Sequence, residues 1–138
     1  MALRISERVL NASANAAVDE VDVGSGVGRI DFYSGSPPAT LSGTPSGNLL
    51  ASVDFSATAF GAASGGSASA ADVPLETTGL DDGDIGFMRV LDGDGVVLWD
   101  DDDVGTSLAR VIVNTTTVST GVAFSVTSFT FGAAADSS

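Results

Sequence analysis

Short runs in which apolar and polar residues alternate dominate the chain from residue 29 onward. Ile30 and Phe32 alternate with Arg29, Asp31 and Tyr33. A period of two is typical of strands that bury one face. Runs bounded by Gly, Pro, Asn, Asp or Ser predict seven strands, at residues 29–33, 49–55, 67–73, 85–91, 96–99, 108–113 and 122–131. This spacing predicts a mainly β, single-domain antiparallel β-sandwich or barrel.

The last of these runs contains an irregularity. Its apolar residues are in phase up to Val126, but Phe129 and Phe131 follow in the opposite phase. A slip of one residue turns side chains to the other face of a sheet. We therefore expect a bulge near Thr127, or two pairing environments along one strand.

A helical pattern precedes the strands, over residues 6–20. Apolar residues recur at spacings of four and three: Ile5, Val9, Ala12 and Ala16. Ser6 is available as the N-cap. The acidic residues from Asp19 to Asp22 are unfavourable at a helix C-terminus, so we expect the helix to end near them, with Gly24-Ser25-Gly26 as the break.

These patterns divide the chain into three parts. We expect an N-terminal helical segment at residues 1–23, a β domain at 24–131 and a flexible tail at 132–138. A short helix is marginal alone in water, and Arg4 and Arg8 place two cations near this one. We hypothesise that residues 1–23 form an attachment arm, without which the β domain still folds. The expected interface residues are Ile5, Arg8, Val9 and Leu10.

The balance of charge limits the partners of this chain. It has 18 acidic residues, five arginines and no lysine, for a net charge of -13. Such a chain is repelled by nucleic acid and by anionic membrane surfaces. No apolar run is long enough for a membrane helix or a signal peptide. We therefore expect neither nucleic acid nor membrane as a partner.

Histidine and cysteine are both absent. The chain thus lacks the usual proton shuttle near neutral pH, a thiol nucleophile and the commonest transition-metal ligands. Without histidine or lysine, no serine triad can be assembled. We expect no enzymatic activity and no catalytic residues.

Two acidic stretches carry the sharpest local pattern. In the first, Asp92-Gly93-Asp94-Gly95, alternating Asp and Gly is similar to calcium loops, and Asp92, Asp94, Asp100 and Asp102 are the candidate ligands. The loop lacks the later ligand positions of an EF-hand, and Asp-Gly also favours a type I′ turn. The preferred interpretation is a β-hairpin with no cofactor, and calcium is the alternative.

The second acidic stretch is a run of four aspartates, residues 100–103. Adjacent carboxylates repel one another, so the run belongs in solvent or opposite cations. It is interpreted as a solvated loop. The functional alternatives are a clamp on an arginine-rich patch of a partner subunit, or cations held between subunits.

Six stretches along the chain form a further pattern: residues 29–38 (RIDFYSGSPP), 47–55 (GNLLASVDF), 59–63 (AFGAA), 87–95 (FMRVLDGDG), 103–107 (DVGTS) and 121–130 (GVAFSVTSFT). Together they resemble a family of small tailed-bacteriophage proteins encoded among head and tail morphogenesis genes. The resemblance covers most of the chain up to Phe131. The resemblance implies a virion structural protein and supplies no functional residues.

The resemblance and the charge together give an expected function. We expect a capsid decoration (cement) protein on the outer head surface, partnered by the major capsid protein and forming a homo-oligomer. Such a protein would be made in the host cytoplasm and reside in the virion. The alternatives are a tail, neck or baseplate component, or a calcium-dependent carbohydrate-binding module with Trp99 and Tyr33 as stacking platforms.

Overall fold

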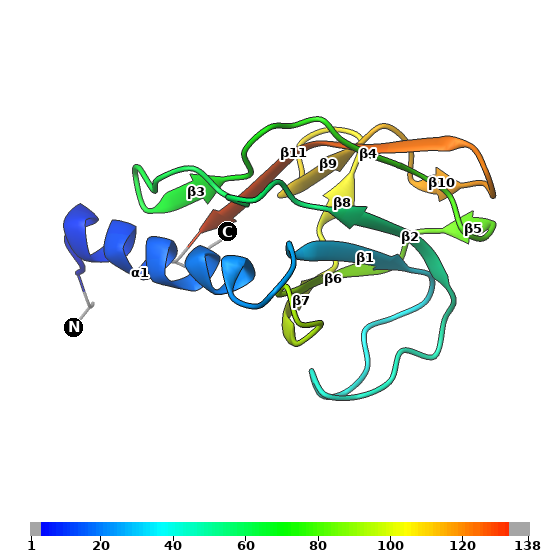
Figure 1. Cartoon of the computed structure of the whole chain (residues 1–138), viewed down its shortest axis with the longest axis horizontal. Coiled ribbons are helices and arrows are strands. Elements are labelled where there is room, and N and C mark those ends of the chain that lie inside the picture. Colours follow the sequence, from blue (N-terminus) through cyan, green and yellow to red (C-terminus); the bar gives the residue numbers. More distant parts are fainter. Residues whose placement is uncertain (1–3, 133–138) are drawn as a thin grey trace.

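Two β-sheets stack face to face, with one short helix at the N-terminal end (Figure 1). The computed structural model describes residues 4–132, so most of the predicted tail at 132–138 lies outside the described residues. The mainly β fold predicted from the alternating pattern is confirmed, and its form is a β-sandwich.

The first sheet has four antiparallel strands in the order β2-β1-β6-β7. Their bounds are β1 (Arg29–Tyr33), β2 (Leu49–Asp54), β6 (Phe87–Leu91) and β7 (Val97–Asp101). The second sheet runs in the order β3-β11-β9-β8, with β4 also paired to β11. Its strands are β3 (Ser67–Ser69), β4 (Leu75–Thr78), β8 (Val104–Gly105), β9 (Val111–Val113) and β11 (Ala123–Gly132). The short strands β5 (Gly83–Asp84) and β10 (Thr117–Val118) form a separate pair.

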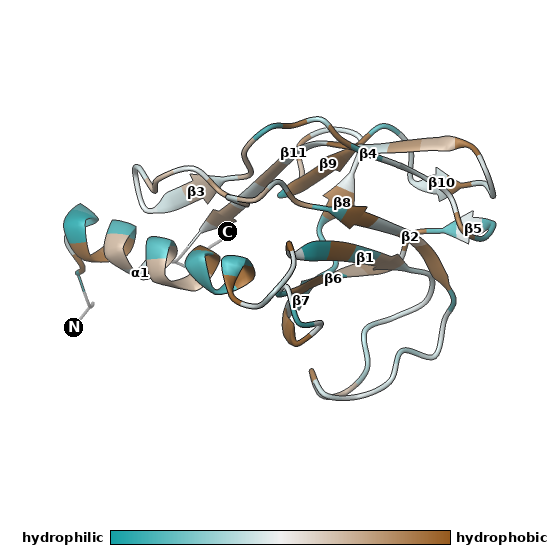
Figure 2. Ribbon diagram, in the orientation of Figure 1, coloured by the Kyte–Doolittle hydropathy of each residue, from teal (hydrophilic) through white to brown (hydrophobic). Residues whose placement is uncertain are grey.

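The alternating residues meet between the two sheets. Phe32 from β1 and Phe124 from β11 are buried and pack edge to face, with ring centroids 5.0 Å apart. Figure 2 shows apolar residues concentrated in the strands of both layers. Period two in the sequence therefore corresponds to burial between the layers.

The slip near Thr127 is a true irregularity of β11. Val126 pairs with Val113 and Ser128 pairs with Ile112, so the register shifts between them. Before the slip β11 pairs with β4, and at its C-terminal end it pairs with β3. Both predicted explanations, a bulge and two pairing environments, are thus confirmed. The slip turns Phe129 into the core, where it packs against Phe55, Phe60 and Trp99.

Some strands differ from the prediction. The strand expected at 67–73 ends at Ser69, and the one expected at 108–113 begins at Val111. Strands β4, β5, β8 and β10 were not predicted. They contain two to four residues each, too few for an alternating pattern to stand out.

The predicted helix is present as α1 (Glu7–Asp19), followed by a 3₁₀ turn, η1 (Glu20–Asp22). Ser6 is the N-cap, as predicted, and its Oγ accepts a hydrogen bond from the Val9 N–H at 3.3 Å. Helical structure ends at Asp22, just before Gly24-Ser25-Gly26. The helix is not set apart from the sheets, because Val18 and Val21 belong to the main core.

Candidate functional site

Helix α1 is fixed to the loop between β2 and β3 by side chains spaced one turn apart. Glu7 Oε2, Asn11 Oδ1 and Asn15 Oδ1 accept hydrogen bonds from the backbone N–H groups of Gly65 (3.0 Å), Gly66 (2.7 Å) and Ala63 (2.8 Å). Beyond the helix, Asp22 Oδ1 accepts from the Ala59 N–H at 2.9 Å. These backbone N–H groups of the loop are not hydrogen-bonded within a strand. They donate instead to side chains of the helical segment, and these hydrogen bonds hold the loop and the helix together.

The inner face of the helix is apolar and buried. Ala14, Val18 and Val21 have at most 2% of their surface exposed. A Cβ on Gly66 would lie 3.3 Å from that of Leu10, so Leu10 packs against its own β2–β3 loop. Of the four expected interface residues, Leu10 therefore contributes to packing within the chain.

The outer face of the helix carries the apolar stripe that the sequence pattern identified. Ile5 is 46% exposed and Val9 is 48% exposed. Ala12 and Ala16 continue the stripe and are also exposed. With 3.6 residues per turn, this stripe lies on the side opposite the buried residues. Arg8, also exposed, lies at its edge. The helix thus has two apolar faces, and only one contacts the described β domain.

The glycine break after the helix is also fixed in place. Asp94 Oδ1 accepts hydrogen bonds from the backbone N–H of Ser25 (3.2 Å) and from its hydroxyl (3.3 Å). The Gly93 N–H donates to the Val23 carbonyl at 2.8 Å. The break is therefore attached to the β6–β7 turn, and the helix holds a defined position.

The β6–β7 connection is the predicted hairpin, but it is not a type I′ turn. The carboxylate of Asp92 accepts from the N–H groups of Asp94 and Val96, each at 2.9 Å. Gly95 alone of the turn residues has a positive φ, +85°, whereas a type I′ turn needs two. The two hydrogen bonds to Asp92 stabilise a longer loop, with Gly95 in the left-handed conformation that glycine adopts most easily.

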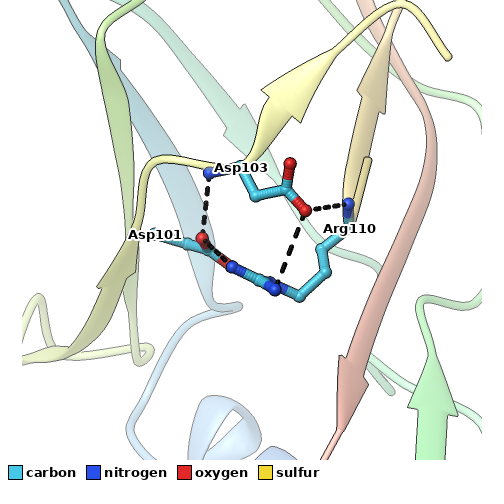
Figure 3. A network of polar contacts seen from close by, with 3 residues as sticks. All are labelled: Asp101, Asp103 and Arg110. Carbon is cyan, nitrogen blue, oxygen red and sulfur yellow. Dashed lines mark hydrogen bonds and ion pairs between the residues drawn. The ribbon is translucent and has the colours of Figure 1, made fainter. Parts of the chain in front are cut away.

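The aspartate run is paired inside the chain (Figure 3). Asp101 accepts two hydrogen bonds from the Arg110 guanidinium, at 2.7 and 2.8 Å. Asp103 accepts from the Arg110 backbone N–H at 3.0 Å, and its own N–H donates to Asp101 at 2.9 Å. Asp100 lies 4.0 Å from Arg89. The run is therefore not simply the solvated loop that was expected, and the cations that the alternative placed on a partner subunit are supplied by this chain.

The pairing changes the acidity of Asp101. Burial acts to raise the pKa of this carboxyl, but the hydrogen bonds from Arg110 and from the Asp103 N–H outweigh it, so its pKa is lowered. A lowered pKa in the folded state means that the charged form stabilises the fold. This stabilisation is complete above the unfolded-state pKa of about 3.9 and is lost as the pH falls through the folded-state value.

We expect Asp101→Asn to lower the free energy of unfolding by about 1 kcal/mol at neutral pH, discounted because Arg110 is half exposed. The difference from the wild-type chain should be constant above about pH 5 and shrink below about pH 4. Urea unfolding at several pH values measures it. The matched control is Asp102→Asn, because no hydrogen bond or ion pair among residues 4–132 uses the Asp102 carboxylate. A difference that persisted unchanged at low pH would contradict this account.

The four candidate calcium ligands do not form one site. Asp92 and Asp94 belong to the turn before β7, whereas Asp100 and Asp102 lie at its other end. The carboxylates of Asp92 and Asp94 already accept backbone hydrogen bonds. Across residues 4–132 no group of three or more acidic side chains is placed to hold a metal ion.

The two aromatic residues considered for carbohydrate stacking each have an aromatic neighbour. Trp99 packs against Phe131, with ring centroids 4.9 Å apart, and against Phe129. Tyr33 stacks on Phe87 at 5.4 Å and an interplanar angle of 13°. Both rings therefore take part in aromatic packing within the sandwich.

Comparisons with protein-family models, with curated proteins and with solved structures gave no match to this chain. In the part of the chain that the structure describes, no helix has the length and apolar character needed to span a membrane. The outer face of α1 is the candidate functional site because its apolar residues Ile5 and Val9 are about half exposed on a helix fixed in position.

Proposed function

We propose that this chain is a structural protein of a tailed-bacteriophage particle, attached to the outer capsid surface as a decoration (cement) protein. The observation that carries the proposal is the outer face of α1. An apolar stripe that remains exposed opposite a buried face, on a helix held at a defined position, is suited to docking on another protein.

The fixed position of the helix favours attachment. The hydrogen bonds that Glu7, Asn11 and Asn15 accept from backbone N–H groups of the β2–β3 loop hold α1 against that loop before any partner arrives. A surface that is already ordered loses less conformational entropy on binding. The small side chains of Ala12 and Ala16 also allow a partner to approach the helix backbone closely.

The charge around the stripe indicates the chemistry of the partner. Arg29, Arg89 and Arg110 each lie within 4.0 Å of an aspartate of this chain. The ion pairs among residues 4–132 include neither Arg4 nor Arg8, which flank the N-terminal end of the stripe. We therefore propose that the stripe binds an apolar groove on the major capsid protein, and that acidic residues along one edge of this groove face Arg4 and Arg8.

The remainder of the molecule supports an exterior position. A net charge of -13 keeps the chain away from packaged DNA. The stretches that resemble the phage family lie largely in β1, β2, β6 and β11, which form the sandwich itself. A small rigid sandwich repeated on a symmetric shell can turn modest individual contacts into firm attachment.

A cryo-electron microscopy map of the phage particle that carries this chain tests the proposal. We expect the sandwich on the outside of the head, in hundreds of copies set by the symmetry of the shell. About six or twelve copies at the tail or neck would instead favour the alternative location. Absence of the chain from the particle would contradict the proposal altogether.

A further inference from the structure

The charges at the two ends of α1 are placed against its helix dipole. Arg4 and Arg8 lie at the N-terminal end, where the dipole is positive. Asp19 and Glu20 lie at the C-terminal end, where the dipole is negative, and the last turn contains no basic residue. Both placements are unfavourable within the helix itself, so these charges are suited to an interaction outside it.

Arg8 and Asp19 are available for such an interaction. Both side chains are exposed, and no hydrogen bond or ion pair within residues 4–132 uses either of them. They are eleven residues apart, which is about three helical turns, so they lie on the same side of the helix. One edge of the apolar stripe therefore carries a cation at its start and an acid at its end.

A surface of this kind is complementary to itself. When two identical helices lie antiparallel about a two-fold axis, the same edge of each helix meets, and the start of one lies beside the end of the other. Arg8 of each copy then lies beside Asp19 of the other, with the axis at the level between residues 13 and 14. The two helix dipoles also oppose each other, which is their favourable arrangement.

We propose that the free chain forms a two-fold dimer through the outer faces of two antiparallel α1 helices. In this register Val9 of one copy lies close to Ala16 of the other, whose small side chain leaves room for it. Ala12 and Ala16 lie near the axis and allow the two backbones to approach closely. The dimer thus covers apolar side chains that are about half exposed in the single chain.

The other acidic side chains near the stripe do not oppose this pairing. Glu7 is turned to the other side of the helix, where it accepts a hydrogen bond from the Gly65 N–H at 3.0 Å. The Glu20 side chains of the two copies lie at opposite ends of the pair. Figure 1 shows α1 at one end of the sandwich, with its first turn extending beyond the strands. The two sandwiches therefore lie apart, which limits repulsion between two chains of net charge -13.

The dimer would regulate attachment, an inference that rests on the proposed function. The second copy supplies an apolar surface with an acid along its edge, which is the chemistry proposed for the capsid groove. Pairing and attachment therefore compete for the same face of α1. The dimer must dissociate before either copy attaches to the particle.

Charge reversal in the full chain tests the pairing. Arg8→Glu and Asp19→Arg each place like charges together in a dimer of identical copies. Sedimentation velocity at up to about 0.5 mM should show dimers of the wild type and association weakened about tenfold or more in each single variant. Both changes suit the helix dipole, so both variants should fold. The control Glu76→Arg, at an exposed position in β4, should pair like the wild type.

Restoring the opposite charges should restore the dimer. The double variant Arg8→Glu/Asp19→Arg has the wild-type net charge, and its copies again place opposite charges together. An equimolar mixture of the two single variants does the same. A wild-type chain that stays monomeric, single variants that associate like the wild type, or a double variant that stays monomeric would each overturn the proposal.

Binding to phage particles assembled without this chain tests the competition separately. Asp19→Arg keeps Ile5, Arg8 and Val9, so it should bind like the wild type in dilute solution. At concentrations where the wild type is dimeric, it should occupy the particles more fully than the wild type and than Glu76→Arg. Equal occupancy at these concentrations would overturn the competition. Particles that bind none of these proteins would contradict the proposed function, whereas the sedimentation result would still decide the pairing.

Discussion

Removing residues 1–22 is expected to unfold the protein. The deletion takes Val18 and Val21 out of the core and removes the acceptors of four backbone N–H groups in the β2–β3 loop. Burial of a valine stabilises a fold by about 1.5–3 kcal/mol, so the two valines alone contribute about 3–6 kcal/mol. That loss is comparable with the whole stability of a small domain, about 5–15 kcal/mol.

Thermal unfolding followed by circular dichroism measures this effect. We expect the truncated chain to show no cooperative transition, or one at a much lower temperature. In the full chain, Val21→Ala should cost about 1.5 kcal/mol, whereas Val9→Ala, the same change at an exposed position, should stay within about 0.5 kcal/mol. A truncated chain that melts like the full one would contradict this account and favour the separable arm expected from the sequence.

The sequence predicts those features of the fold that depend on neighbouring residues. The helix with Ser6 as its N-cap, the hairpin after β6 and the irregularity near Thr127 are all present. Each rests on a local cause: a hydroxyl that caps a helix, glycine in a hairpin loop, and a phase slip in an alternating strand. Local causes are visible in a single sequence.

Features that depend on distant residues could not be predicted in this way. The pattern Ile5, Val9, Ala12 and Ala16 suggests the buried face of an amphipathic helix, yet the sheets pack against Val18 and Val21 instead. Both faces of the helix are apolar, so only the packing of the whole sandwich decides which face is buried. A second signal was present in the one-turn spacing of Glu7, Asn11 and Asn15, which mark the side of the helix that contacts the loop.

The aspartate run shows the same limit. Four adjacent acids predict a solvated loop or an external cation, because nothing in the sequence says which arginine will lie beside them. Arg110 lies beside Asp101 because the loop after β8 returns the chain to the start of that strand, so that β8 and β9 pair in parallel. The ion pair between Asp101 and Arg110 therefore depends on the fold and is not visible in the local sequence.

Attachment through the outer face of α1 is tested by a binding measurement with Val9→Asp, whose matched control is Val122→Asp. Both valines are about half exposed, at 48% and 56%, and Val122 lies just before β11 on the β domain. An acid in the first turn of a helix is also compatible with the helix dipole, so both variants should fold like the wild type, which thermal unfolding checks. Binding is then measured to phage particles assembled without this chain.

We expect Val9→Asp to lower the affinity for these particles about tenfold or more, because a carboxylate would be buried against an apolar groove with acidic residues at its edge. The control Val122→Asp should bind like the wild type. Equal binding of Val9→Asp and Val122→Asp, with both proteins folded, would show that the outer face of α1 is not the attachment surface.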